Sequence, residues 1–383
     1  MQNIKYKISG FKCFADKSFE LKNITLLTGS NGTGKSSFIQ ALLLIRSAIE
    51  RNCADSNSVN YINKTWKNTS VPLNGPFLLN LGSVYDIFNE SEKASNRIEI
   101  ELGQEVFHID FPLEDEPNDR CNVKLKTELS EDNGSFWRNQ KFYYLHTERL
   151  GPRLGVDSIY TEFPHCNYRG ENTAEVISKY GVSIKISDDR LNSNIKSPNL
   201  QEQVDGWLSF ICPGTIGVKS KLQDINRYQI TMRSSAGKND ILAPNIGFGI
   251  SYALPIIVNG LIAEKDSIFI VENPEAHLHP KGQSNMGFFL GMVAASGVRI
   301  IVETHSEHIV NGIRKASLHK NSLNPENVGI YFFEDFKNNK NQTHEIVISE
   351  SGDLESFPKD FFDQVGQDMA ELFKLKNFYK NER

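Results

Sequence analysis

Short hydrophobic runs occupy the first 50 positions of the chain, and a glycine-rich turn interrupts them. Residues 4–8 and 18–21 predict short strands, whereas 24–28 (ITLLT) is a continuous apolar and threonine run typical of a buried strand. Residues 36–50 contain neither Gly nor Pro and predict a helix. A buried strand, a glycine-rich turn and a helix therefore follow one another, as in an α/β protein.

Alternating hydrophobic and polar positions dominate the next hundred residues. The runs that predict antiparallel strands are RIEIEL at 97–102, VFHIDF at 106–111, NVKLKTEL at 122–129 and KFYYLH at 141–146. Residues 151–240 lack a sustained pattern, and Asn/Ser/Asp-rich breaks near 187–200 indicate a partly helical insertion.

A second α/β stretch starts near residue 245. SIFIV at 267–271 and RIIVE at 299–303 predict buried strands, and two further strands, 329–334 and 345–349, flank an Asn/Lys-rich hairpin. The tail, 352–383, predicts a helix of mixed charge, and no coiled-coil heptads appear. We divide the chain into 1–150, 151–240, 241–345 and 346–383, in which the first and third ranges form one split domain.

Composition narrows the class of protein. The 383 residues are 39% hydrophobic and 23% charged, which is ordinary for a folded protein, and the net charge of −5 argues against a wholesale basic coat for nucleic acid. Five scattered cysteines without a C-x-x-C pair favour a reducing compartment. The N-terminus shows no secretory signal, so we expect a cytoplasmic protein.

The glycine-rich turn GSNGTGKS, residues 29–36, matches the phosphate-binding loop pattern G-x-x-x-x-G-K-[ST]. Its glycines allow backbone N–H groups to face a phosphate, and the following helix adds its N-terminal partial charge. Lys35 is expected to reach the β/γ-phosphates of ATP, and the Ser36 hydroxyl to bind Mg²⁺. The nucleotide-binding residues predicted from this loop are Asn31, Gly32, Thr33, Gly34, Lys35, Ser36 and Ser37.

Acidic residues lie at the ends of the two buried strands that are predicted at 267–271 and 299–303. Glu272 follows SIFIV and is the expected second residue of the Mg²⁺ site, and Glu303 ends RIIVE two positions before His305. A histidine there is placed to hydrogen-bond a γ-phosphate or the attacking water. His277 and His279 lack the further ligands of a zinc site.

The phosphate loop with its flanks, ENPEAHLHP at 272–280 and ETHSEHIV at 303–310 together resemble the ABC-type ATPase heads of the SMC and RecF kind. They are most similar to short bacterial AAA-labelled ATPases related to overcoming-lysogenisation-defect (OLD) proteins. EHIVNGIRKA, PKDFFDQ and YYLHTERLGPR also resemble segments of that group. The resemblance implies an α/β P-loop NTPase, an ABC-ATPase head-like split domain with an antiparallel β lobe and a partly helical insertion.

The same resemblance implies that ATP lies between two heads, with the P-loop of one facing a signature turn of the other. The matching turn is NIGFGISY at 245–252, where Gly247, Gly249 and Ser251 are the expected nucleotide-binding residues and Gly247 replaces the usual serine. This turn and a buried helix after it account for the apolar run 246–263, which is long enough to span a membrane. We therefore expect no membrane association.

Asn273 stands where these heads usually carry the glutamate that serves as general base. An amide does not accept a proton at neutral pH. Either Glu275 or Glu303 acts as the base, or hydrolysis is slow and the protein is an ATP-bound switch. The candidate catalytic residues are Glu272, Asn273, Glu275, Glu303 and His305.

Two functions fit these features. The first is an ATPase switch that forms a homodimer or higher homo-oligomer and controls a separate, nuclease-like effector in bacterial antiphage defence. The second is a RecF-like DNA-binding ATPase of DNA repair. The basic residues near 226–238 either form an edge for DNA or belong to the solvated surface, and the surface is the favoured interpretation. Arg149 and Arg153 are either members of surface or inter-domain salt bridges or sensors of nucleotide or partner.

Overall fold

The computed structural model describes residues 1–54, 68–89, 97–110, 118–126, 141–234, 240–319, 323–334 and 343–381. A central sheet of six strands organises them, in the order β16-β15-β3-β14-β13-β8. Its strands are parallel except that β16 runs antiparallel to β15. The bounds are β3 Ile24–Gly29, β8 Phe142–Leu145, β13 Ile268–Glu272, β14 Arg299–Glu303, β15 Val328–Phe333 and β16 Thr343–Ile346.

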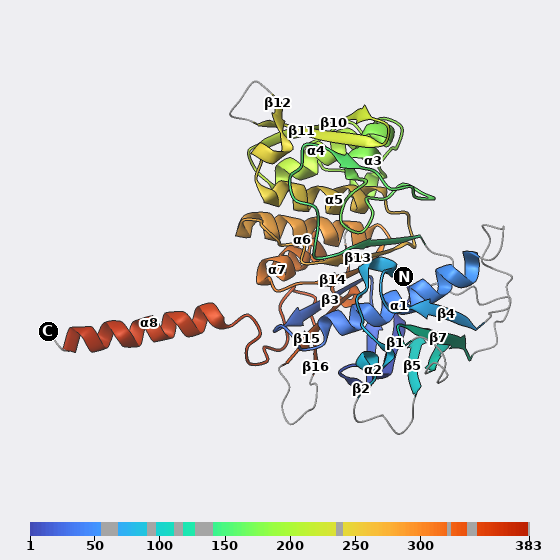
Figure 1. Ribbon diagram of the computed structural model, residues 1–383. Coiled ribbons are helices and arrows are strands. Elements are labelled where there is room, and N and C mark those ends of the chain that lie inside the picture. Colours follow the sequence, from blue (N-terminus) through green and yellow to red (C-terminus); the bar gives the residue numbers. More distant parts are fainter. Residues whose placement is uncertain are drawn as a thin grey trace.

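One face of this sheet carries helix α1 (Lys35–Ala54) and, beyond it, a second, antiparallel sheet (Figure 1). That sheet has the order β2-β1-β5-β6-β7-β4. Its strands are β1 Ile4–Phe11, β2 Phe14–Leu21, β4 Thr69–Pro72, β5 Arg97–Leu102, β6 Glu105–Asp110 and β7 Arg120–Leu125, with α2 (Val84–Ile87) beside them. One hydrophobic core joins α1 to both sheets.

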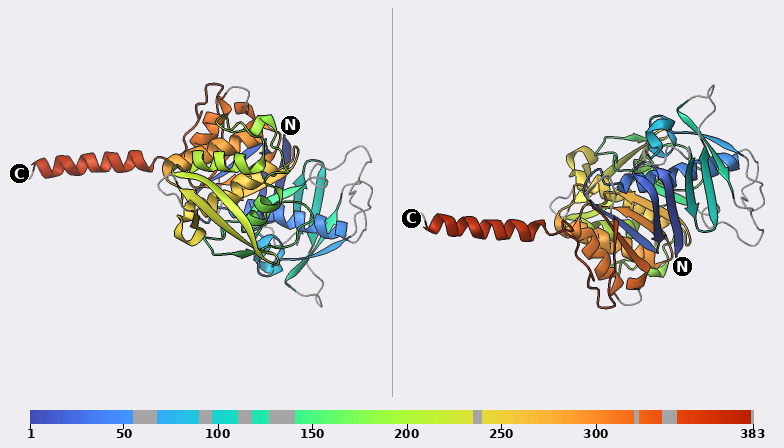
Figure 2. Two further views of the ribbon diagram at one scale, coloured as in Figure 1. Left: turned by 90° about the horizontal axis from the view of Figure 1, so that it is seen from above. Right: turned by 90° about the horizontal axis from the view of Figure 1, so that it is seen from below.

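The opposite face of the central sheet carries the remaining helices in layers (Figures 1 and 2). They are α3 Thr173–Tyr180, α4 Leu200–Ile211, α5 Phe248–Ile262, α6 Pro280–Ala295 and α7 Glu307–Ser317. A small sheet of β9 (Val156–Asp157), β10 (Thr215–Asp224), β11 (Arg227–Ser234) and β12 (Asp240–Leu242) covers the outermost helices. Helix α8 (Gln364–Asn381) stands apart from the body.

The architecture confirms the predicted α/β P-loop fold with an antiparallel lobe. The run 141–146 is a correction: its strand β8 pairs in parallel with β13 rather than with the antiparallel strands. All four of its residues are buried, which is typical of a parallel strand covered on both faces. The expected domain boundaries stay predictions, and the expected hairpin turn at 335–342 lies outside the described residues, as do 235–238 of the candidate DNA edge.

The apolar run 246–263 forms α5, which lies within the layered helices. Its buried Asn259 accepts a hydrogen bond from the backbone N–H of Cys166 at 2.9 Å. Within the described part of the chain, no helix combines the length and hydropathy that crossing a membrane requires.

Helices α6 and α7 pack at backbone contact because glycines face each other. A Cβ atom on Gly287 would lie 2.2 Å from the carbonyl oxygen of Ile309, and one on Gly312 would lie 2.1 Å from that of Ser284. Neither position leaves room for a side chain. This contact fixes the starts of α6 and α7 against each other, and both helices begin at turns of the candidate site.

Candidate nucleotide-binding site

The phosphate loop connects β3 to α1 at the carboxyl edge of the central sheet. Gly32 has φ +77°, and a Cβ atom there would meet nothing within 4 Å, so its backbone borders open space. Gly29 has φ +128°, and a Cβ there would lie 2.2 Å from the carbonyl oxygen of Phe333 on β15. The loop is thus anchored to the neighbouring strand on one side and open on the other, which fits a phosphate cradle.

Lys35 is buried at the start of α1. Its Nζ donates hydrogen bonds to the carbonyl oxygens of Gly29, at 2.9 Å, and Ser30. Thr33 Oγ1 also donates to the Ser30 carbonyl, at 2.8 Å. The lysine charge is therefore held inside the loop, as binding of a polyphosphate requires.

Glu303 is the carboxylate nearest to the P-loop serine. Ser36 Oγ donates to Glu303 Oε1 at 3.1 Å, because β14 lies directly beside β3 in the sheet. Burial and, after it, the charge of Glu272 raise the pKa of Glu303 from 4.5 to about 7, although Lys35 and the Ser36 hydrogen bond oppose the rise. The Glu303 carboxylate and the Ser36 hydroxyl offer oxygen atoms, and burial makes the negative charge of Glu303 unfavourable. The position therefore suits a divalent cation.

Glu272 lies one strand further from the P-loop, at the end of β13. Its Oε1 accepts a hydrogen bond from the Tyr144 hydroxyl at 2.8 Å, and its Oε2 accepts one from Thr147 Oγ1 at 2.7 Å. Burial, and next the charge of Glu272, raise the pKa of Tyr144 far above its ordinary value. The metal role of Glu272 stays a prediction, and the structure adds Glu303 as the carboxylate in contact with Ser36.

The turn after Glu272 is held in an uncommon backbone conformation. Asn273 has φ +45°, and its N–H donates to the carbonyl oxygen of Glu303 at 2.8 Å. Its side-chain oxygen is buried and has no hydrogen-bond partner among the described residues. A buried acceptor without a partner is uncommon in a folded protein, and here it lies in a turn with positive φ next to Glu272.

Glu275 joins this turn to the turn that follows β14. It accepts hydrogen bonds from Thr304 Oγ1 at 2.8 Å and from the backbone N–H of His305 at 2.7 Å. Burial raises its pKa despite these bonds. Both carboxylate oxygens are thus occupied in fixing the second turn.

His305 follows β14 beside the P-loop. Burial and then the positive charge of Lys35 lower its pKa below 6.5, while a hydrogen bond to the Gly29 carbonyl acts in the opposite direction. The imidazole is therefore neutral at pH 7 and has a ring nitrogen that can donate. The structure brings His305 to the P-loop, and its catalytic role stays a prediction.

Arg149 has a function in the fold that neither reading of the sequence identified. The guanidinium is buried and donates to the carbonyl oxygens of Glu272 and Asn273, each at 2.6 Å. It also lies over the ring of Tyr252 on α5, at 5.2 Å from the centroid. Arg149 thus holds the backbone of the acidic turn rather than pairing with a carboxylate. Tyr144 in β8, and Thr147 and Arg149 just after it, all belong to the segment 143–153, whose resemblance to related ATPases was the only available signal.

The expected signature turn lies at the start of α5 and packs against the ENPEAHLHP segment. Gly247 precedes the helix, and a Cβ atom on Gly249 would lie 2.4 Å from the carbonyl oxygen of His277. A groove of about 380 Å³ opens here. Its lining residues are Ile211, Cys212, Pro213, Gly247, Gly249, Ile250, His277, Leu278, His279, Lys281 and Gly282.

None of the P-loop residues lines this groove. The two parts of the predicted ATP site therefore occupy separate places within one chain. Ser251 faces a different pocket, together with Leu150, Gly170 and Pro255.

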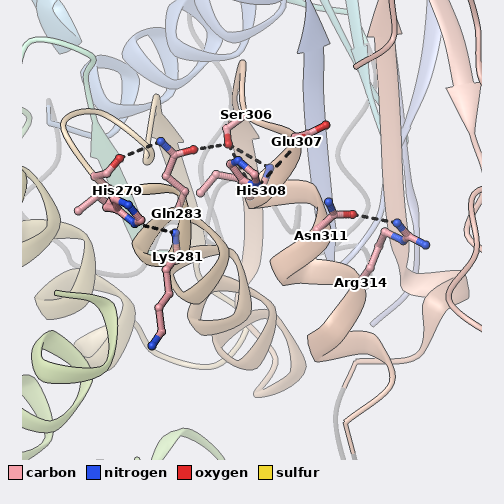
Figure 3. Close-up of polar contacts among 10 residues, drawn as sticks. His279, Lys281, Gln283, Ser306, Glu307, His308, Asn311 and Arg314 are labelled. Atoms are coloured by element: carbon pink, nitrogen blue, oxygen red, sulfur yellow. Dashed lines mark hydrogen bonds and ion pairs between the residues drawn. The ribbon is translucent and has the colours of Figure 1, made fainter. Parts of the chain in front are cut away.

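Polar contacts tie the starts of α6 and α7 together (Figure 3). Gln283 donates to the carbonyl oxygen of Leu278 at 2.9 Å, and its Oε1 accepts a hydrogen bond from Ser306 Oγ at 2.6 Å. Ser306 Oγ also accepts from the backbone N–H of His308 at 3.1 Å and so caps α7. The turn beside the groove and the turn beside the P-loop are thereby connected through hydrogen bonds.

The P-loop, the acidic strand ends and the parallel sheet define the class of protein: an ATP-binding ATPase of the P-loop type. Residues 24–311, more than half of the chain, match the family described as "AAA domain, putative AbiEii toxin, Type IV TA system". The chain belongs to this family. Residues 323–372 match a second family, described as a protein of unknown function (DUF3696). The matched range includes the PKDFFDQ segment.

Among curated proteins, a sequence search found no match to the chain. Solved structures with a similar arrangement include an SMC head bound to the C-winged helix domain of ScpA (12% identity, 91% of this chain and 98% of that chain, TM-score 0.48). Another is the SMC head domain from Thermotoga maritima (12% identity, 90% and 99%, TM-score 0.41). A third is the Pyrococcus furiosus SMC head with an extended coiled coil, bound to the C-terminal domain of ScpA (9% identity, 98% and 100%, TM-score 0.45).

Proposed function

We propose that this ATPase is a nucleotide-gated switch, in which two copies close around ATP and the closed dimer controls a separate, nuclease-like effector in antiphage defence. The observation that carries the proposal is the separation of the signature groove from the P-loop within one chain. A P-loop that faces the groove of a second copy completes two such sites by symmetry. Gly247 and Gly249 then border the γ-phosphate side of the partner's site, at the start of α5, where the helix dipole favours negative charge.

The residues of each P-loop hold the nucleotide in this proposal. The open backbone at Gly32 and the buried Lys35 bind the phosphates, and Ser36 with Glu303 and Glu272 surrounds Mg²⁺. Mg²⁺-bound ATP supplies a concentrated negative charge and a transferable phosphoryl group. His305, neutral at pH 7, is placed to donate a hydrogen bond on the same side.

Slow hydrolysis makes the ATP-bound state long-lived, as a switch requires. Asn273 carries no group that accepts a proton, and Glu275 uses both oxygens to hold the neighbouring turn. Loss of a general base typically lowers a rate by roughly 10²- to 10⁴-fold. Asn273→Glu is therefore expected to raise the turnover of ATP by at least about tenfold, whereas Asn273→Gln, which keeps the amide, leaves it unchanged. A fast wild-type rate that Asn273→Glu does not alter contradicts slow hydrolysis.

The family description supports a role in defence, because it names a putative toxin of a toxin–antitoxin system. The decisive experiment is to purify the chain with the products of its neighbouring genes and to measure nuclease activity with and without ATP. Co-elution with a nuclease whose activity depends on ATP, and loses that dependence with Lys35→Ala, supports the switch. Tight DNA binding and DNA-stimulated ATP turnover by the chain alone favour the RecF-like repair function instead.

A further inference from the structure

Helix α8 projects from the body of the protein (Figures 1 and 2). Every residue from 364 to 377 is exposed, and five of them are large and apolar with 47–67% of their surface exposed. These five are Val365, Met369, Leu372, Phe373 and Leu375. An isolated helix of this length is marginally stable in water, so it needs a packing partner.

The apolar residues of α8 share one face. Val365, Met369 and Leu372 are spaced by four and three residues, the spacing that aligns side chains along one helix surface. Phe373 and Leu375 flank this line on either side. Such a contiguous apolar face on an exposed helix marks an interaction surface rather than scattered surface hydrophobes.

Charge along α8 indicates which partner fits this face. Asp368 and Glu371 lie in its first half, and Lys374 and Lys376 lie in its second half. If a second α8 lies antiparallel and centred on Leu372, Asp368 of each copy faces Lys376 of the other. A parallel arrangement instead places like charges at the same level, which destabilises such pairs.

We propose that α8 is a homodimerisation helix that pairs in antiparallel fashion with α8 of a second copy, independently of nucleotide. In this register Met369 also meets Leu375 of the second copy, and Leu372 meets its own counterpart, so the middle of the apolar face is covered. The helix pair is smaller than a standard protein interface, so its affinity is modest. It keeps two heads at a high effective concentration, which favours any further contact between them.

The test uses the full chain carrying Lys35→Ala and without nucleotide, so that closure around ATP does not contribute. Sedimentation equilibrium or light scattering at tens of micromolar is expected to show a dimer. Leu372→Glu and Phe373→Glu are expected to give monomers. Gln367→Glu, which adds the same charge on the opposite face of α8, is expected to retain the dimer.

A charge exchange identifies the partner as a second copy. Asp368→Lys and Lys376→Asp are each expected to weaken the dimer by roughly fivefold, because each creates two like-charge pairs by symmetry. The double variant restores the opposite charges and is expected to regain wild-type affinity. This rescue also shows that the single variants do not act through misfolding.

Three results overturn the proposal. The first is a monomer at tens of micromolar for the chain with native α8. The second is a dimer that Leu372→Glu leaves intact. The third is a double charge variant whose dimer is no tighter than the dimers of the single variants. That result is expected if α8 binds its own head, another protein or a lipid surface. A failure of the proposed ATP-dependent closure has a different signature, because it leaves the nucleotide-free dimer intact.

Discussion

Glu303 provides the sharpest test of the candidate site, because its charge is unfavourable in the protein without metal. Its carboxyl group is buried beside Ser36, and burial and the charge of Glu272 raise its pKa from 4.5 to about 7. Glu303→Gln keeps the shape and the acceptor for the Ser36 hydroxyl but removes the charge. We expect the variant to be more stable than the wild type in metal-free solution above neutral pH.

The magnitude follows from proton linkage. Below pH 4.5 both the folded and the unfolded protein carry the protonated acid. Between pH 4.5 and about 7 only the unfolded state loses this proton, so the folded state becomes relatively less stable as pH rises. The full penalty is about 3 kcal/mol at pH 8 and about 1 kcal/mol at pH 5.5.

The assay is urea unfolding of both proteins in EDTA at pH 5.5 and pH 8. The free energy of unfolding of Glu303→Gln is expected to exceed that of the wild type by a margin that grows by about 2 kcal/mol between these pH values. Glu355→Gln makes the same change of charge at an exposed position and is expected to stay within about 0.5 kcal/mol of the wild type at both.

Mg²⁺ and ATP are expected to stabilise the wild type more than Glu303→Gln. A cation beside Glu303 makes its charge favourable, so the wild type is expected to gain more stability from the ligand than Glu303→Gln does. A margin between the two proteins that is the same at pH 5.5 and pH 8 refutes the electrostatic reasoning. Equal stabilisation by Mg²⁺ and ATP refutes the placement of the cation beside Glu303.

Two further substitutions test the rest of the site. Lys35→Ala removes the buried ammonium of the P-loop and is expected to abolish ATP binding in calorimetry; unimpaired affinity contradicts the site assignment. Arg149→Lys replaces a two-pronged donor by a single ammonium that does not reach the carbonyls of Glu272 and Asn273 together. It is expected to destabilise the protein by roughly 2 kcal/mol and to raise the KM for ATP, and wild-type values for both would show that the turn does not depend on Arg149.

The sequence predicted the elements of the fold better than their neighbours in space. Hydrophobic runs are local, so β3, β13 and β14 were all expected at the positions where they occur. The strand at 141–146 was placed with the antiparallel strands because it follows them in the chain. Its parallel partner β13 lies more than a hundred residues away, and no local pattern encodes that pairing.

The candidate site divides in the same way. The P-loop was predictable because one turn and one helix start supply all its groups. The contact between Ser36 and Glu303 depends instead on the order of strands, which puts β14 and not β13 beside β3. The role of Arg149 was missed because it binds backbone carbonyl oxygens, which every residue carries and which leave no trace in the sequence.

These contacts connect the two separated parts of the site. Tyr252 on α5 lies against the Arg149 guanidinium, which in turn holds the carbonyl oxygens of Glu272 and Asn273. Asn273 keeps its positive φ while its N–H is bonded to Glu303, the residue in contact with Ser36. A displacement of α5 therefore acts on a turn with positive φ that is hydrogen-bonded to Glu303, the residue in contact with the P-loop serine. Because such a turn has few alternative conformations, contact at the signature groove and occupancy of the P-loop are expected to influence each other in both directions.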